Sequence, residues 1–209
     1  MTDKQLDAAA SATREALRHA FPDSISSVVA QTVELIPPPP RPELGPHGVM
    51  GDLSVDGERV VIPYRIYTPE PRAELATSLD EDAALALTCC YTRHHDGFLR
   101  EQSVISIIGF DRAWIVPFVI QLLGEYVVEI SESILERLDE LQPEIYRRFA
   151  AANESFMRLT RNHIVSYWAC YYRAQYRLPA YPPVRVLMEL GLWNGREGRH
   201  WLARGGHST

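Results

Sequence analysis

The hydrophobic and polar positions of this chain are organised around one long apolar run, AWIVPFVIQLLGEYVVEI, at residues 113–130. Between Trp114 and Leu123 the run is apolar on almost every side of a helix, a pattern typical of a buried helix rather than an amphipathic one. Only about 10–12 residues pass before polar residues interrupt it, which is too short for the ~20 residues of a membrane span. The pattern therefore predicts a central core helix.

A polar stripe follows, and its spacing predicts that this helix continues to Leu138 with one acidic face. The stripe comprises Gln121, Glu125, Glu129, Glu132 and Glu136. Two shorter helices should precede the central helix. Ser78 and Glu81 have the spacing of a capping box and predict a helix that ends near His95, and a second helix is expected from about Arg100 to Ile108. Asp111 is expected to cap the central helix.

Helical spacing also predicts an N-terminal helix over residues 4–20, and residues 25–36 fit either a helix or a strand. Two strands, 49–55 and 59–67, should form a hairpin around Asp56-Gly57, a favourable turn pair. A last long helix is expected from Pro143 to Leu178, because apolar residues recur there at alternating steps of four and three. So long a helix would need a long partner, either the central helix or the same helix of a second subunit.

These elements predict a mainly α fold, a helical bundle with some character of a helical repeat, one β-hairpin and an N-terminal helical arm. The expected divisions are an arm at 1–36, a proline-rich linker at 37–47, and a hairpin plus helical domain at 48–209.

Composition narrows the function classes. The chain has 209 residues and a net charge of −6, which argues against nucleic-acid binding. Its three cysteines, two of them adjacent, do not suggest a disulfide framework, and no apolar signal core is seen at the N-terminus. A cytoplasmic protein without a membrane segment is expected. One lysine against twenty arginines suggests a high-GC genome.

Three groups of residues could carry chemistry. The first is Arg93-His94-His95-Asp96, where His94 or His95 could act as acid or base. Adjacent histidines point in different directions on a helix, so they would not chelate one metal as a pair one turn apart would. The plain alternative is a polar helix terminus whose histidines interact with the helix dipole.

The second group is the carboxylate stripe, in which Glu125 and Glu129 could meet His163 and hold a metal ion. No Glu-x-x-His motif repeats as in di-metal bundles, so a solvated acidic face is the default and no cofactor is expected. Glu125 differs from the others because it borders the apolar run. If it is buried, it needs a charged partner or its pKa rises.

The third group lies in RNHIVSYWACYYRAQYR, residues 161–177, which mixes arginines with aromatic residues. Such a composition suits a protein interface, a small-molecule pocket or nucleotide stacking. The candidate contact residues are Tyr167, Trp168, Tyr171, Tyr172 and Arg173.

The segments CCYTRHHDGFLRE and WIVPFVIQLLGEYVVEI, together with IPYRIYTPEP, resemble a family of uncharacterised proteins of streptomycete-type, actinobacterial origin. The resemblance covers roughly residues 58–175 and implies a helix-dominated cytoplasmic protein, without a function.

No Gly-rich phosphate loop, nucleophile elbow, H-E-x-x-H or C-x-x-C motif occurs in the chain. The first hypothesis is therefore a non-enzymatic interaction or scaffold protein that pairs with itself as a homodimer, or with another protein. The alternative is an enzyme or a small-ligand or metal-binding protein, with Arg93, His94, His95, Glu125 and His163 around a polar pocket in the bundle. Nucleic-acid binding is the third and weakest.

Overall fold

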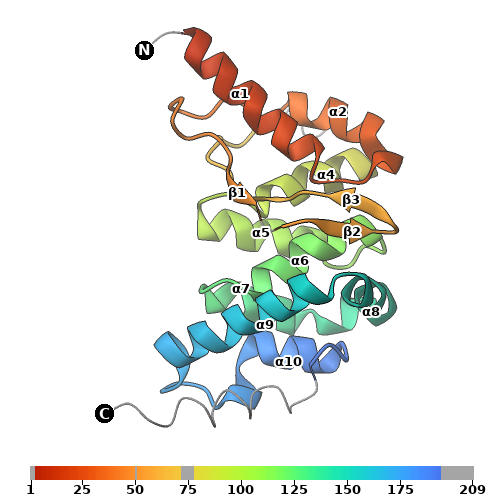
Figure 1. Ribbon diagram of the computed structural model, residues 1–209, viewed down its shortest axis with the longest axis vertical. Coiled ribbons are helices and arrows are strands. Elements are labelled where there is room, and N and C mark those ends of the chain that lie inside the picture. The colour runs from red at the N-terminus through yellow and green to blue at the C-terminus, as the bar shows by residue number, and fades with distance from the viewer. Residues whose placement is uncertain (1–2, 50, 72–77, 194–209) are drawn as a thin grey trace.

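The computed structural model describes residues 3–49, 51–71 and 78–193 and shows helices stacked along one long axis (Figure 1). Helices α1 (Asp3–Arg18) and α2 (Ser26–Glu34) form one end of the stack, and α10 (Pro182–Glu189) forms the other. Between them α2 packs against α4 (Glu81–Tyr91), α4 against α5 (Gly97–Ile107), α5 against α7 (Val128–Glu136), and α7 against α10. The mainly α prediction with a small β part is confirmed.

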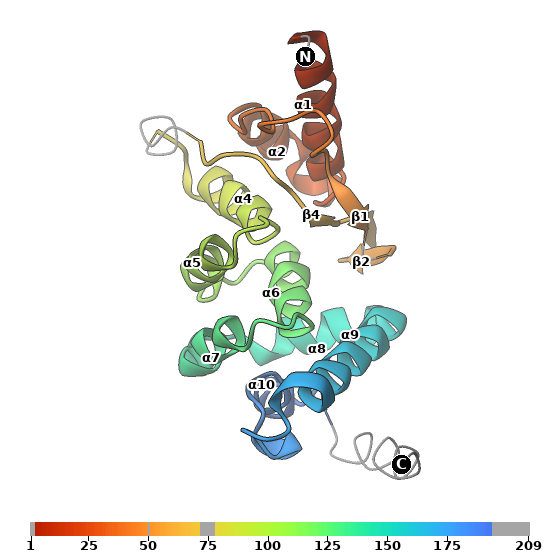
Figure 2. The same cartoon turned by 90° about the vertical axis from the view of Figure 1, so that its left-hand side faces the viewer.

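The remaining helices lie beside the stack, with α6 near the middle of the molecule and α8 and α9 in its lower half (Figure 2). They are α6 (Val116–Leu123), α8 (Pro143–Ala152), α9 (Glu154–Tyr167) and the π-helical turn η4 (Trp168–Tyr172). Short 3-10 helices are η1 (Asp23–Ile25), η2 (Ala113–Ile115), η3 (Leu138–Glu140) and η5 (Leu178–Ala180). Both α8 and α9 pack against α6, which places α6 in the middle of the molecule.

Helix α6 is the predicted core helix, and all eight of its residues are buried. It does not continue to Leu138, because the chain leaves the helix at Gly124 and re-enters one as α7 at Val128. A Cβ atom on Gly124 would lie 3.2 Å from the Cγ2 atom of Thr160 on α9, so this close crossing favours glycine. The prediction of one acidic helical face is therefore wrong: Glu125 lies in the turn between the two helices.

The expected long helix from Pro143 to Leu178 is also divided. Asn153 separates α8 from α9, and its amide Nδ2 donates to the carbonyl of Phe149, four residues earlier. A short polar side chain that bonds to the local backbone competes with the helix, which explains the break. The heptad-like spacing of this region thus belongs to two helices and a π-helical turn, rather than to one coiled-coil strand.

Asn153 also completes the β part of the fold. Its Oδ1 accepts from the backbone N–H of Ser54, and its Nδ2 donates to the Ser54 carbonyl, both at 2.8 Å. Ser54 is the middle residue of β2 (Leu53–Val55), which pairs with β3 (Glu58–Val60) on its other side. One side chain therefore supplies the hydrogen bonds that a neighbouring strand would give.

The predicted hairpin turn is present at Asp56-Gly57, where both residues have positive φ, 49° and 88°. This geometry suits a two-residue hairpin connection. The single strand predicted over 49–55 is instead two short strands with different partners. β1 (His47–Val49) pairs with β4 (Pro63–Arg65), while β2 pairs with β3.

Three predicted helix starts differ from those observed. The N-cap of α4 is Asp80 rather than Ser78, since the Asp80 carboxylate accepts from the N–H of Ala83 at 2.8 Å. Asp96 caps α5, which therefore begins at Gly97 rather than near Arg100. The residue preceding η2 is Arg112, so Asp111 is not a cap.

One continuous hydrophobic core contains side chains of β2 and β3 together with those of the helices. Phe21, directly after α1, packs against Trp114 and Phe118, with ring centroids 5.8 and 5.1 Å apart. Residues 37–46 connect α2 to β1 without helix or strand. The first two helices therefore rest directly on the central part of the molecule.

Candidate functional site

The most highly charged place in the interior is built around Glu125. This carboxylate is 2% exposed and contacts three arginines from three other parts of the chain. Arg65 from β4 binds it with two parallel hydrogen bonds, Nη1 to Oε1 at 2.9 Å and Nη2 to Oε2 at 2.8 Å. Arg93, after α4, donates from Nη2 to Oε1, and the Nε of Arg100 on α5 lies 3.0 Å from Oε2. We call these four residues the arginine–glutamate cluster.

Backbone carbonyls share the excess positive charge of the cluster. Arg65 Nη1 donates to the carbonyl of Tyr64 at 2.8 Å, and Arg100 Nη1 donates to the carbonyls of His94 and His95 at 2.9 Å each. The latter two carbonyls lie just beyond the C-terminal end of α4, where the helix dipole favours a cation. The cluster therefore fastens β4, the end of α4, the start of α5 and the end of α6 to one another.

Burial and charge oppose each other in setting the pKa of Glu125. Burial alone would raise its pKa, but the charges of Arg93, Arg65 and Arg100 outweigh that effect and hold the pKa below its usual value. Burial lowers the pKa of Arg93 to about 10, and the charge of Glu125 offsets part of this. Glu125 and Arg93 are thus both ionised at neutral pH. A carboxylate with its oxygens taken up by arginines does not act as a general base, so this cluster has a structural role.

The two adjacent histidines fall into different surroundings. His94 is buried: its Nε2 lies 2.9 Å from the carbonyl of Thr68, and its Nδ1 accepts from the N–H of Asp96 at 3.1 Å. These partners fix a neutral ring with the proton on Nε2, and burial lowers the pKa of His94. His95 is exposed and stacks on Tyr67 at 5.2 Å. The structure brings neither ring to Glu125.

His163 and Glu129 likewise do not join the cluster. His163 is half-buried on α9, where its ring lies 6.2 Å from that of Tyr167. Glu129 is exposed on the first turn of α7. Within residues 3–49, 51–71 and 78–193, no group of three or more His, Cys, Asp or Glu side chains is arranged to hold a metal ion.

Three tyrosines of the third candidate group gather with Tyr126 on one surface. The ring of Tyr167 lies 6.2 Å from Tyr126 and 6.4 Å from Tyr171, and Tyr171 lies 6.4 Å from Tyr172. Tyr126 is 55% exposed and Tyr171 is 68% exposed, while the other two are half-buried. We call these four residues the tyrosine face.

Contacts with the interior hold the tyrosine face rigidly in place. Tyr172 donates from its hydroxyl to the carbonyl of Tyr126 at 2.6 Å and stacks at 5.4 Å on Tyr181, which is fully buried. Trp168 is half-buried and donates from Nε1 to the carbonyl of Tyr176 at 2.9 Å. A π-helical turn, the form of η4, occurs often at functional sites.

Arg173 directly follows this turn and is exposed. The four predicted aromatic contact residues and Arg173 thus lie in one stretch of the chain. Trp168 packs into the interior more than it contributes to the surface.

An acidic hollow lies beside the tyrosine face. Its volume is about 440 Å³, and its lining comes from the start of α5 and the start of α7. The lining residues are Asp96, Gly97, Phe98, Glu101, Val127 and Glu129. Val127 follows Tyr126 in the chain, so the turn between α6 and α7 contributes one residue to the hollow and one to the tyrosine face. Phe98 is 79% exposed, an unusual position for a phenylalanine.

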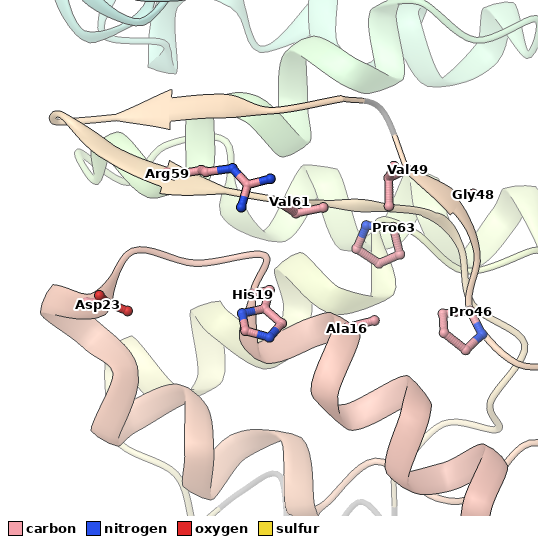
Figure 3. Close-up of a pocket in the computed structure, with 9 residues that line it drawn as sticks. All are labelled: Ala16, His19, Asp23, Pro46, Gly48, Val49, Arg59, Val61 and Pro63. Carbon is pink, nitrogen blue, oxygen red and sulfur yellow. The ribbon is translucent and has the colours of Figure 1, made fainter.

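A larger hollow, of about 700 Å³, lies between the end of α1 and the β strands (Figure 3). One end of this hollow is lined by Asp23, His19 and Arg59, and the other end by Pro46, Gly48 and Val49. Two of its ionisable groups are already paired, His19 with Glu15 and Arg59 with Asp52. The rest of the lining is apolar except for Asp23, so this hollow holds few groups that could take part in chemistry.

Sequence reasoning named Glu125 and Arg93 but missed Arg65, Arg100 and Phe98. Arg65 lies sixty residues before its carboxylate partner, and no local pattern connects the two. One signal was available: a glutamate beside an apolar run requires cationic partners, and an arginine within the β4 region was a candidate. Phe98 gave no signal, because a lone phenylalanine in a polar segment is normally expected to be buried.

No family model matches this chain, and no curated protein or solved structure matches it either. Within the described residues, none of the helices combines the length and the apolar character that crossing a bilayer requires. The tyrosine face and the acidic hollow are the features from which a role can be inferred.

Proposed function

We propose that this chain is a non-enzymatic interaction protein that binds another protein through the tyrosine face. The observation that carries the proposal is the exposure of Tyr126 and Tyr171 on a rigid base, with rings in a continuous row. Tyrosine supplies a large contact area at a low cost in side-chain entropy and is enriched among residues that dominate binding energy.

The surroundings of the buried groups Glu125 and His94 also favour an interaction protein over an enzyme. Glu125 is enclosed by arginines, and His94 is fixed as a neutral ring between two backbone groups. Neither is placed to exchange a proton with a substrate. The polar pocket required by the alternative hypothesis would need these side chains to be accessible.

Self-association through this same face is less suitable than binding to a different protein. Two-fold pairing places equivalent surfaces against each other. The acidic hollow would then be brought near its own copy, and like charges across an interface cost affinity. The division of the 143–178 region into α8 and α9 also removes the long helix on which a coiled-coil homodimer would depend.

Site-specific photocrosslinking tests the proposal. A photoreactive phenylalanine analogue placed at Tyr171 should yield a crosslinked adduct in extracts of the source cells. The same analogue at Asp7, exposed on α1 at the far end of the stack, should not. Replacing Tyr126 by alanine should reduce the adduct at position 171. The mass of the adduct separates a second copy of the chain from a different protein. Equal adducts at the two positions, or none at position 171, would refute the proposal.

A further inference from the structure

The acidic hollow carries three carboxylates that have no cationic partner in the described structure. Asp96 uses Oδ1 to cap α5, and Glu101 accepts from the hydroxyl of Ser133 at 2.5 Å. Glu129 is exposed at the first turn of α7. Among residues 3–49, 51–71 and 78–193, no arginine, lysine or histidine forms an ion pair with Asp96, Glu101 or Glu129.

These three carboxylates differ from the surface acids that do have an arginine partner. Arginines elsewhere lie against acidic groups on the surface, as Arg112 does with Glu81 and Asp82, and as Arg59 does with Asp52. Asp96, Glu101 and Glu129 therefore carry their charge without an ion pair of their own, while Arg100, which binds Glu125, lies behind Gly97 of the lining. An incoming cation would find three carboxylates within one small concavity.

Apolar and aromatic groups stand beside these carboxylates. Phe98 and Val127 line the hollow, and Tyr126, which precedes Val127 in the chain, is exposed. An aromatic face attracts a cation, and its apolar area also covers the stem of a long side chain. A hollow of about 440 Å³ lies within the range of natural binding pockets.

We infer that the acidic hollow receives an arginine side chain of the partner protein, which anchors the partner to the adjoining tyrosine face. The inference rests on the proposed function, since it names the chemistry of the partner that the tyrosine face would bind. The guanidinium suits this site better than the ammonium of lysine, because its planar fork binds carboxylates with two hydrogen bonds and stacks on aromatic rings. A phosphate-bearing partner, such as nucleic acid, would be repelled by the same three carboxylates.

The test uses the full chain and a defined probe. The probe is a fluorescent nonapeptide, GSARLRASG, and its matched control carries citrulline in place of both arginines. Citrulline has the same shape but no charge. Fluorescence anisotropy should show binding of the arginine peptide that weakens as salt is raised, and binding of the citrulline peptide that is about tenfold weaker or more.

Variants locate the binding. Glu129→Gln and Phe98→Ala change exposed side chains, so both variants should fold, and each should weaken the arginine peptide roughly three- to tenfold. Glu136→Gln removes one charge from the same helix, outside the hollow, and should leave the affinity unchanged.

Each remaining outcome decides the question. Equal affinity for the two peptides, or no binding of the arginine peptide up to millimolar concentration, overturns the arginine inference. If crosslinking at Tyr171 still captures a protein in that case, the proposed function stands without it. If crosslinking at Tyr171 also fails, both the arginine inference and the proposed function are refuted. An effect of Glu136→Gln as large as that of Glu129→Gln would place the binding outside the hollow and would overturn the inference as well.

Discussion

Replacing Glu125 by glutamine is the sharpest perturbation of the interior that the structure allows. The substitution keeps the size of the side chain and removes its charge. Each carboxylate oxygen of Glu125 contacts two arginine nitrogens: Oε1 contacts Arg65 and Arg93, and Oε2 contacts Arg65 and Arg100. In glutamine, one oxygen becomes an NH₂ group. In either orientation of the amide, two arginine N–H groups then face a donor instead of an acceptor.

The expected loss of stability follows from the arginine charges that remain buried. Removing one partner of a buried ion pair leaves an uncompensated charge, which typically costs about 3–5 kcal/mol. Here three arginines, between 0% and 11% exposed in their side chains, lose the one carboxylate they share. For a chain of 209 residues, 1 kcal/mol shifts the melting temperature by about 2–4 °C, so we expect a decrease of roughly 6–20 °C.

Urea unfolding and calorimetry would measure this change. Glu129→Gln is the control, because it removes the same charge from an exposed position on the next helix and should alter the free energy of unfolding by less than about 0.5 kcal/mol. The reasoning is wrong if Glu125→Gln costs less than about 1 kcal/mol. That result would mean that the backbone carbonyls around the arginines suffice to stabilise them.

The pH dependence supplies a second check on the same residue. In the unfolded chain the pKa of a glutamate is about 4.3. In the folded protein burial would raise the pKa of Glu125, but the arginine charges outweigh burial and lower it. The unfolded state therefore binds a proton more readily. The stabilisation is fully present above about pH 4.3 and is lost as the pH falls through the lower folded value. Glu125→Gln should lack this contribution.

Further predictions concern single side chains. Asn153→Ala should cost about 1–3 kcal/mol and speed hydrogen exchange at the amide of Ser54, because the strand edge loses both of its hydrogen bonds; unchanged exchange would contradict this role. Burial lowers the pKa of His94, so the unfolded state binds its proton more readily, and stability should fall as the pH drops below about 6.5. Titrating the free energy of unfolding of wild type and His94→Gln would show the difference, and identical profiles would rule it out. Cys170, which is exposed, should react with a thiol reagent in the native state, whereas the two buried cysteines should react only on unfolding; rapid reaction of all three thiols would contradict their burial.

Much of the local structure could be predicted from spacing alone. The apolar run gave α6, the helical spacing near the N-terminus gave α1, and Asp56-Gly57 gave the hairpin turn. These features depend on residues within a few positions of one another, where periodicity and turn preference act directly.

The errors in the predicted helix boundaries share a different cause. The ends of α6 and α8 are set by contacts with distant segments: Gly124 accommodates Thr160 of α9, and Asn153 bonds to Ser54 of β2. Each residue is compatible with a continuing helix when only its neighbours are considered. Tertiary contacts overrode that local preference. For the same reason Arg65 and Arg100 could not be identified as partners of Glu125, although its need for partners could.

The arginine–glutamate cluster also bears on the order in which the chain folds. Arg65 and Glu125 are sixty residues apart in sequence, and the intervening helices must be in place before both can meet. Contacts of such separation carry a large loop-closure cost and form late. A variant that lacks the cluster should therefore reach its folded state at nearly the normal speed but leave it sooner, so that the carboxylate governs the lifetime of the native molecule more than the rate of its formation.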